Sequence, residues 1–259
     1  LVDMKKLLAI IIAALMICML ASCKKDDNKN PDDTGDDTRA ETSADNDTFT
    51  YEIGKGDTAI ITGYTGSYSL HTVEVPDMID GREVVGIGTK AFYYNSAITA
   101  VTLPATVTSI GDYAFAGCSL LEKVTLGGEV TTVGDYAFTN CVKLKELGLP
   151  DTVTTIGTGA YFGCTALTEI KLPASLETIG ANAFYGCKAI TSVEIPEKVK
   201  TIGDMAFYEC EKLESAKLTA GIEEIGKYIF HKCAETLTVE APADSVAAKY
   251  ANDNGYTLK

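Results

Sequence analysis

The sequence predicts a repeat solenoid built from short parallel strands, and two observations carry this prediction. A 23-residue period runs without a gap from Ile87 to Gly226. Each of its seven blocks begins with Ile-Gly or Val-Gly and has an aromatic residue at position 6: Phe92, Phe115, Phe138, Tyr161, Phe184, Phe207 and Phe230. A unit of this length is unstable alone and buries its apolar edge against its neighbours, so the blocks are expected to stack in one elongated domain.

The apolar positions within a block predict a strand and a turn. In the second block, Val124 and Leu126 alternate with polar residues, which is typical of a short strand with one buried face. Ala114, Phe115 and Cys118 have the spacing of one helical or 3₁₀ turn with its apolar side inward. We expect the glycine at position 2 to permit a tight bend, and the proline after several strands to end them, because proline cannot donate to the ladder. The strands of successive blocks should therefore form one parallel sheet.

The two ends of the period are expected to be capped, because terminal repeats must differ from the rest to keep the core covered. The predicted segments are an N-terminal cap over 49–86, seven repeats over 87–241 of which the last is degenerate, and a C-terminal cap over 242–259. Within the caps, the sequence predicts strands at 59–61 and 73–76, a turn at 80–81, a helix at 245–251 and a last strand at 256–258.

The first 48 residues predict export and attachment to a membrane. Residues 1–22 have a basic start followed by the apolar run Leu7 to Leu20, which is too short to span a bilayer comfortably and is typical of a signal peptide. The sequence Leu-Ala-Ser-Cys at 20–23 resembles a bacterial lipobox, in which cleavage leaves Cys23 as a lipidated N-terminus. Residues 23–48 are acidic and nearly free of apolar side chains, so we expect a flexible tether.

Six cysteines occupy position 9 of the last six blocks: Cys118, Cys141, Cys164, Cys187, Cys210 and Cys233. Metal sites need closer spacings and histidine partners, and the sequence offers no such set. Stacked neighbours would lie within disulfide reach, but their parallel Cα–Cβ directions suit bridging poorly. Buried structural thiols are therefore the preferred interpretation, with disulfides and metal binding as alternatives. No metal or cofactor is expected.

The composition argues against catalysis and against nucleic acid. His71 and His231 are the two histidines of the chain, and His231 is so close to Cys233 on one turn that their side chains should diverge. No Ser-His-Asp set or metal motif is present, so we expect a protein that is not an enzyme. The net charge of −14 and the pI near 4.6 disfavour phosphate binding, which needs clustered Lys and Arg.

Two surfaces are candidates for partner binding. The first, which we call the strand face, consists of the outward positions 14 and 16 of the strands: Lys123, Thr125, Glu146, Glu169, Lys171, Ser192, Glu194, Ser215 and Lys217. The second, the aromatic row, stands at position 7: Phe162, Tyr185, Tyr208 and His231. Alternating charges on the strand face fit either simple cross-strand pairing or a surface for a protein partner. The aromatic row can either pack on the core turn or anchor an interface.

The recurring signature L-x-x-[VIL]-x-[LI]-P-x-x-[VLI]-x-x-I-G-x-x-A-F-x-x-C resembles the BspA-like leucine-rich repeat family over residues 49–259. The resemblance implies a leucine-rich-repeat-like solenoid whose strands line the concave side of one curved sheet. It also implies a bacterial surface protein, here anchored by lipid on Cys23, that binds a host or neighbouring-cell protein or glycoconjugate. The alternative is an envelope scaffold that organises other proteins of the same cell.

Overall fold

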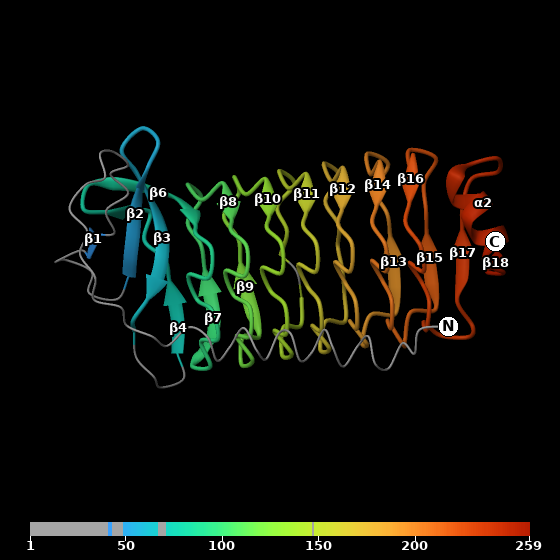
Figure 1. Cartoon of the computed structure of the whole chain (residues 1–259), viewed down its shortest axis with the longest axis horizontal. Helices are drawn as coiled ribbons and strands as arrows, with labels where there is room; N and C mark the ends of the chain where they lie inside the picture. Colours follow the sequence, from blue (N-terminus) through green and yellow to red (C-terminus); the bar gives the residue numbers. More distant parts are fainter. Residues whose placement is uncertain (1–40, 43–48, 67–70, 147) are drawn as a thin grey trace, which may run out of the picture. The chain divides into compact units, whose positions relative to one another are not determined.

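The computed structural model describes residues 41–42, 49–66, 71–146 and 148–259. The chain divides into two compact units, Leu1–Asp37 and Thr38–Lys259, and the first lies outside the described residues. The expected signal peptide, Cys23 and nearly all of the expected tether fall there or in the other undescribed stretches. The second unit is a stack of coils, one per 23-residue block, in which the strands of successive coils lie side by side (Figure 1).

A long parallel ladder joins the coils where one block ends and the next begins. Its strands are β8 (Ser109–Ile110), β10 (Thr132–Val133), β11 (Thr155–Ile156), β12 (Thr178–Ile179), β14 (Thr201–Ile202) and β16 (Glu224–Ile225). Each strand pairs with the next at a register of one block, as Ile110 does with Val133, and the aliphatic side chains point into the core. The sequence analysis did not anticipate this ladder, because a two-residue strand is too short to show alternation.

A second set of strands lies at positions 14–16, as expected. Its members are β4 (His71–Glu74), β7 (Ile98–Thr102), β9 (Lys123–Thr125), β13 (Ser192–Glu194), β15 (Ser215–Lys217), β17 (Thr238–Glu240) and β18 (Thr257–Leu258). They form two sheets, β4-β7-β9 and β13-β15-β17-β18. Two isolated bridges, Thr125↔Gly148 and Glu146↔Glu169, extend the pairing from β9 across the next two coils. The expected parallel pairing of these strands is present, and among the described residues it is divided between two sheets. Gly148 weakens its strand, and the opposed Glu146 and Glu169 repel each other, which accounts for isolated bridges in place of a longer ladder among the described residues of these coils.

The turn after each long-ladder strand differs from the helical or 3₁₀ turn that the sequence predicted. Amides alternate between partners: Ala116 N donates to Tyr113 O of its own coil, whereas Phe115 N donates to Ala137 O of the next coil. Left-handed residues recur on this run, with φ of 56° at Tyr113 and 74° at Gly117. Every second amide is thereby directed at the neighbouring coil, which a helical turn would prevent.

The glycine at position 2 has a role other than the tight bend that we expected. Gly203 and Gly226 do not adopt a left-handed φ. A Cβ atom added to Gly203 would lie 2.3 Å from Ala181 N, and one added to Gly226 would lie 2.3 Å from Asp204 N. Real Cβ atoms essentially never approach so closely. These glycines let the backbones of adjacent coils pack against each other.

The core contains a continuous stack of position-6 rings. Successive centroids from Phe92 to Phe207 are 4.7–5.4 Å apart, with interplanar angles of 9° or less. All of these rings are buried. This alignment follows from the constant period, which places each aromatic side chain directly over the one in the preceding coil.

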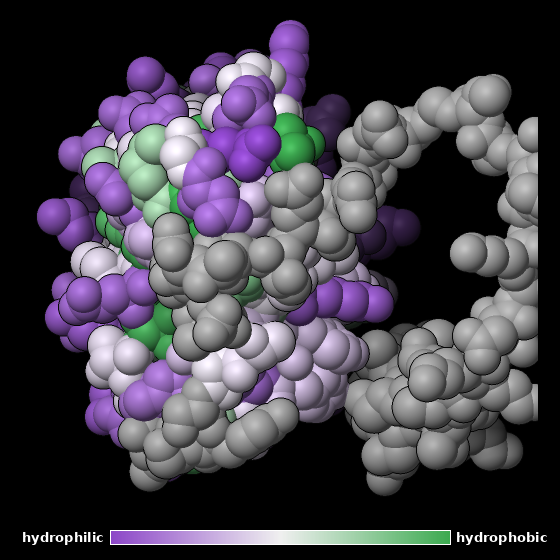
Figure 2. All heavy atoms as spheres, turned by 90° about the vertical axis from the view of Figure 1, so that its left-hand side faces the viewer, coloured by the Kyte–Doolittle hydropathy of each residue, from purple (hydrophilic) through white to green (hydrophobic). Residues whose placement is uncertain are grey.

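The N-terminal cap continues the long ladder with five strands. These are β1 (Glu41–Thr42), β2 (Phe49–Gly54), β3 (Thr58–Tyr64), β5 (Met78–Ile79) and β6 (Arg82–Ile87). Of these, β3 and β6 pair in parallel, and the pairs β1-β2, β2-β3 and β5-β6 are antiparallel. Asp80 and Gly81 join β5 to β6 with φ of 50° and 78°, which is the two-residue hairpin turn expected for Asp-Gly. Seen from this end, the cap shows mostly hydrophilic side chains with small hydrophobic areas between them (Figure 2).

The C-terminal cap contains the expected helix, α2 (Val246–Asp253). Ser245 caps it by accepting a hydrogen bond from Ala248 N over 3.0 Å, and the small side chains of Ala247 and Ala251 are buried. The helix lies at the end of the stack opposite the β2–β3 hairpin (Figure 1). No helix in the described part of the chain is long and apolar enough to cross a membrane.

Candidate binding surfaces

The strand face presents exposed side chains on successive coils. The predicted residues Lys123, Thr125, Glu146, Glu169, Lys171, Ser192, Glu194, Ser215 and Lys217 are all exposed. The pairing of β13, β15 and β17 sets Glu194 beside Lys217 and Lys217 beside Glu240. Lys217 Nζ lies 2.8 Å from Glu194 Oε1. That hydrogen bond, together with the charges of Glu194 and Glu240, raises the pKa of Lys217.

The charges alternate along the strand face from Lys171 through Glu194 and Lys217 to Glu240, but not all neighbours form ion pairs. Lys171 makes no ion pair with any other described residue, although Glu194 is the next charge along the ladder. Further along, Glu146 pairs with Glu169 in an isolated bridge, which places two like charges on adjacent coils. Exposed ion pairs contribute little to stability, so the pairing does not by itself explain this surface. The strand face therefore offers both cations and anions to a partner.

The side chains of the aromatic row stack on one another from coil to coil. Ring centroids are 4.6 Å apart for Phe162 and Tyr185, 4.9 Å for Tyr185 and Tyr208, and 5.4 Å for Tyr208 and His231. Tyr208 is only 5% exposed, and the ammonium of Lys232 lies 5.1 Å from the centre of its ring. Because the rings stack face to face, they present mainly their edges outward. This arrangement favours packing over binding for the row.

The position-9 thiols are free, and all except the half-buried Cys233 are buried. Each thiol donates a hydrogen bond of 3.0–3.3 Å to the carbonyl oxygen of the position-6 residue one coil earlier. Burial raises the pKa of Cys118, Cys164 and Cys233 to about 12. Since the thiolate is the nucleophile and the metal ligand, the raised pKa disfavours both roles for these thiols. Among the residues that the structure describes, no three His, Cys, Asp or Glu side chains are grouped to hold a metal ion.

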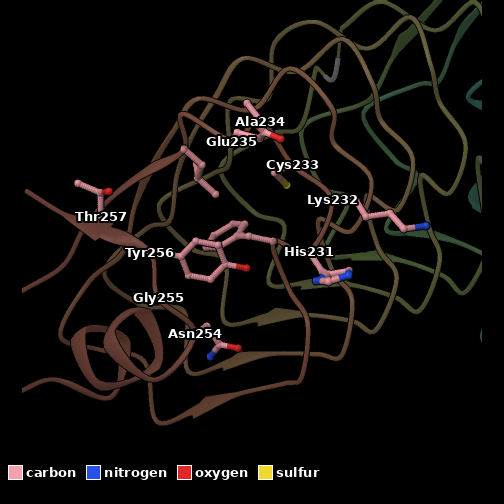
Figure 3. A pocket seen from close by; sticks show the side chains of 11 residues that line it. His231, Lys232, Cys233, Ala234, Glu235, Asn254, Gly255, Tyr256 and Thr257 are labelled. Atoms are coloured by element: carbon pink, nitrogen blue, oxygen red, sulfur yellow. The ribbon is translucent and has the colours of Figure 1, made fainter. Parts of the chain in front are cut away.

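A pocket of about 300 Å³ lies between the last coil and the C-terminal cap (Figure 3). Cys233 and His231 line it from the coil, and Asn254 and Tyr256 line it from the cap. The buried leucine of this block, Leu237, comes one position later than in the preceding blocks. This shift was the sequence signal for the pocket, and our sequence analysis missed it. The pocket contains no activated nucleophile.

A cluster of tyrosines on the first three coils was also missed. It consists of Tyr93, Tyr94, Tyr113 and Tyr136, and we call it the tyrosine cluster. Tyrosine recurs at position 4 of two successive blocks, as Tyr113 and Tyr136, and this recurrence could have revealed it. Position 7 carries the longer run of aromatic residues, so the aromatic row is the more conspicuous pattern in the sequence.

The stacked coils, the parallel ladders and the exposed strand face define a leucine-rich-repeat-like solenoid. The family described as "BspA type Leucine rich repeat region" matches residues 85–187 and 131–251, with 6 copies of the repeat. The chain belongs to this family, so the predicted family and fold class are confirmed.

Solved structures show the same architecture. The T. pallidum leucine rich repeat protein TpLRR is 31% identical over 85% of this chain and 98% of its own, with a TM-score of 0.70. A protein described as a leucine rich cell surface protein from Faecalibacterium prausnitzii is 28% identical, with a TM-score of 0.71. A leucine-rich repeat protein from Bacteroides ovatus is also 28% identical, with a TM-score of 0.58.

The matches differ in extent. The alignments cover 81% and 76% of this chain but only 56% and 58% of the F. prausnitzii and B. ovatus chains. This chain therefore spans little more than half the length of those two proteins. A comparison with curated proteins found no match.

Proposed function

We propose that this protein is a lipid-anchored, non-catalytic binding module of the bacterial cell surface. It adheres through the strand face to a protein or glycoconjugate of a host or a neighbouring cell. The observation that carries the proposal is the run of exposed cations and anions on successive coils, of which Lys171 remains unpaired among the described residues. A regular, rigid array of this kind is suited to a partner with complementary charges.

The likeness to a relative described as a cell surface protein supports the proposed location. The lipid anchor rests on the lipobox at 20–23, which lies outside the described residues. Replacing Cys23 with Ser removes the acyl acceptor and should release the protein from membranes on cell fractionation, whereas Cys18→Ser should not. If the Cys23→Ser protein still sediments with membranes, the lipid anchor is wrong.

Binding to a panel of host matrix proteins and whole neighbouring bacteria tests adhesion. We expect saturable binding that falls at least about tenfold when Lys171 and Lys217 are both changed to Glu, because each change reverses a charge on the strand face. The matched control is Lys188→Glu, which reverses an exposed, ion-paired lysine at position 10 and should bind normally.

Two other outcomes would redirect the proposal. Weaker binding by Tyr185→Ala, with normal binding by the strand-face variant, would assign adhesion to the aromatic row. No binding across the panel, together with resistance of the protein on intact cells to added protease, would favour the envelope scaffold.

A further inference from the structure

The tyrosine cluster presents two roughly perpendicular rings on the surface of the first coils. We call the ring of Tyr93 the first wall and the ring of Tyr113 the second wall. The rings of Tyr93 and Tyr113 meet at 82° with centroids 6.5 Å apart, and those of Tyr93 and Tyr94 meet at 81° with centroids 4.6 Å apart. Tyr136 stacks on Tyr113 at 5.1 Å and 13°, which supports the second wall from the next coil. Tyr93 is 41% exposed and Tyr94 is 48% exposed. A partner can therefore reach the ring of Tyr93, and it can reach the half-buried ring of Tyr113 at its exposed part.

The neighbouring coils leave room for these rings. A Cβ atom added to Gly117 would lie 2.8 Å from the ring of Tyr94, and one added to Gly159 would lie 2.4 Å from the ring of Tyr136. Both rings thus rest against glycine backbone, and a larger residue would displace them. Rings held in this way lose little conformational freedom when a partner binds, which favours affinity.

The two walls already hold a cation. The ammonium of Lys90 lies 5.5 Å from the ring centre of Tyr93 and 6.0 Å from that of Tyr113. Both distances fall within the range in which a ring face attracts a cation, and aromatic cages for ammonium groups use the same geometry. Lys90 is exposed on a flexible four-carbon stem, so a second cation can compete with it for the same place.

The charges around the cluster favour a cation as well. The carboxylates of Asp112 and Asp135 lie near the phenol of Tyr113, whose pKa is raised by burial and then by Tyr136, Asp112 and Asp135. One oxygen of each carboxylate accepts a backbone amide, from Asp135 N over 2.8 Å and from Thr158 N over 2.7 Å. The two acids give the site negative charge, and the net charge of −14 would steer a basic partner toward it.

We propose that the tyrosine cluster is a docking site for an arginine or lysine side chain of a basic polypeptide partner, and that Lys90 occupies the site until the partner displaces it. The inference rests on the proposed function and deepens it, because it supplies the chemistry of the partner and a second contact beside the strand face. A sugar would fit this site less well than a cationic side chain. The rings of Tyr93 and Tyr113 are nearly perpendicular, and the ammonium of Lys90 lies close to both.

Binding of a fluorescent ten-residue peptide with three arginines to the full-length chain at ~0.15 M salt tests this inference. Tyr93→Leu and Tyr113→Leu keep apolar bulk but remove the aromatic face, and each should weaken binding about 3- to 30-fold. Lys90→Gln should strengthen binding about threefold or more, because the internal competitor is gone. Lys227→Gln removes the same charge from the exposed surface of the last coil and should change binding much less.

Several results would overturn the inference. Equal gains for Lys90→Gln and Lys227→Gln would show attraction by net charge alone. Unchanged binding by well-folded Tyr93→Leu and Tyr113→Leu chains would show that the rings take no part. Binding of a neutral oligosaccharide that depends on Tyr113 but not on Lys90 would assign the cluster to sugars. The peptide assay uses no cells or matrix proteins, so its failure is distinct from a failure of the proposed adhesion.

Discussion

The thiol of Cys141 donates a hydrogen bond to the carbonyl oxygen of Phe115 over 3.2 Å, from one coil to the coil before it. The same bond recurs along the ladder. Each thiol thus adds a hydrogen bond from the next coil to a carbonyl oxygen that also accepts the position-9 amide of its own coil. The cysteines therefore join adjacent coils without forming disulfides.

Because these thiols are buried and un-ionised, we expect them to resist alkylation in the folded protein. At pH 8, iodoacetamide should leave Cys118, Cys141, Cys164, Cys187 and Cys210 unmodified, and Cys233 should react slowly because it is half-buried. In urea all six should react at similar rates. Mass spectrometry of the labelled peptides would measure both, and rapid labelling of Cys141 in native protein would contradict the buried ladder.

The raised thiol pKa values also predict a loss of stability in alkali. Burial raises the pKa of Cys164 from 9.0 to about 12. As the pH rises above 9, the unfolded chain releases this proton before the folded chain does, so the free energy of unfolding falls between about pH 9 and 12. Below pH 9 this thiol contributes no pH dependence.

Urea denaturation at several pH values between 8 and 11 would measure this decline. Cys164→Ser removes one titrating thiol, and its stability should fall less steeply with pH than that of the unaltered chain. Parallel slopes for the two proteins would mean that Cys164 ionises as readily in the folded state as in the unfolded state.

The aromatic stack predicts a large cost for a truncated ring. Phe138 is 1% exposed and lies 5.1 Å from Phe115 and 5.2 Å from Tyr161, centre to centre. Phe138→Ala should lower the free energy of unfolding by about 3–5 kcal/mol, because it opens a cavity in the core. Val142→Ala, at a 39% exposed position of the same block, should cost less than about 0.5 kcal/mol. Chemical denaturation would compare them, and equal stability would mean that the repeat register is wrong.

The close approach of the coils predicts that position 2 accepts only glycine. Gly203→Ala would place a methyl group 2.3 Å from Ala181 N, so the coils must separate, at a cost of at least about 1–3 kcal/mol. Gly128→Ala is the matched control, because an added Cβ there meets nothing within 4 Å. Thermal denaturation should show a lower Tm for Gly203→Ala alone. A similar Tm for both variants would refute the close-packing role.

The 23-residue period made the stacking of coils and their core predictable from the sequence. The position of Phe115 is buried in every coil, and the position of Val124 is buried wherever the structure describes it, so burial leaves a repeating apolar pattern. The hairpin at Asp80-Gly81 was predictable for a local reason, since that dipeptide favours the backbone angles of a two-residue turn.

The tertiary structure alone decided how one coil touches the next. The role of Gly203 depends on the distance to a backbone atom 22 residues earlier. The like charges that meet on the strand face depend on Glu146 lying opposite Glu169. The tyrosine cluster likewise depends on the directions of rings from three coils. A sequence period sets which residues are in register, but the distance and angle between them come from how tightly the coils pack.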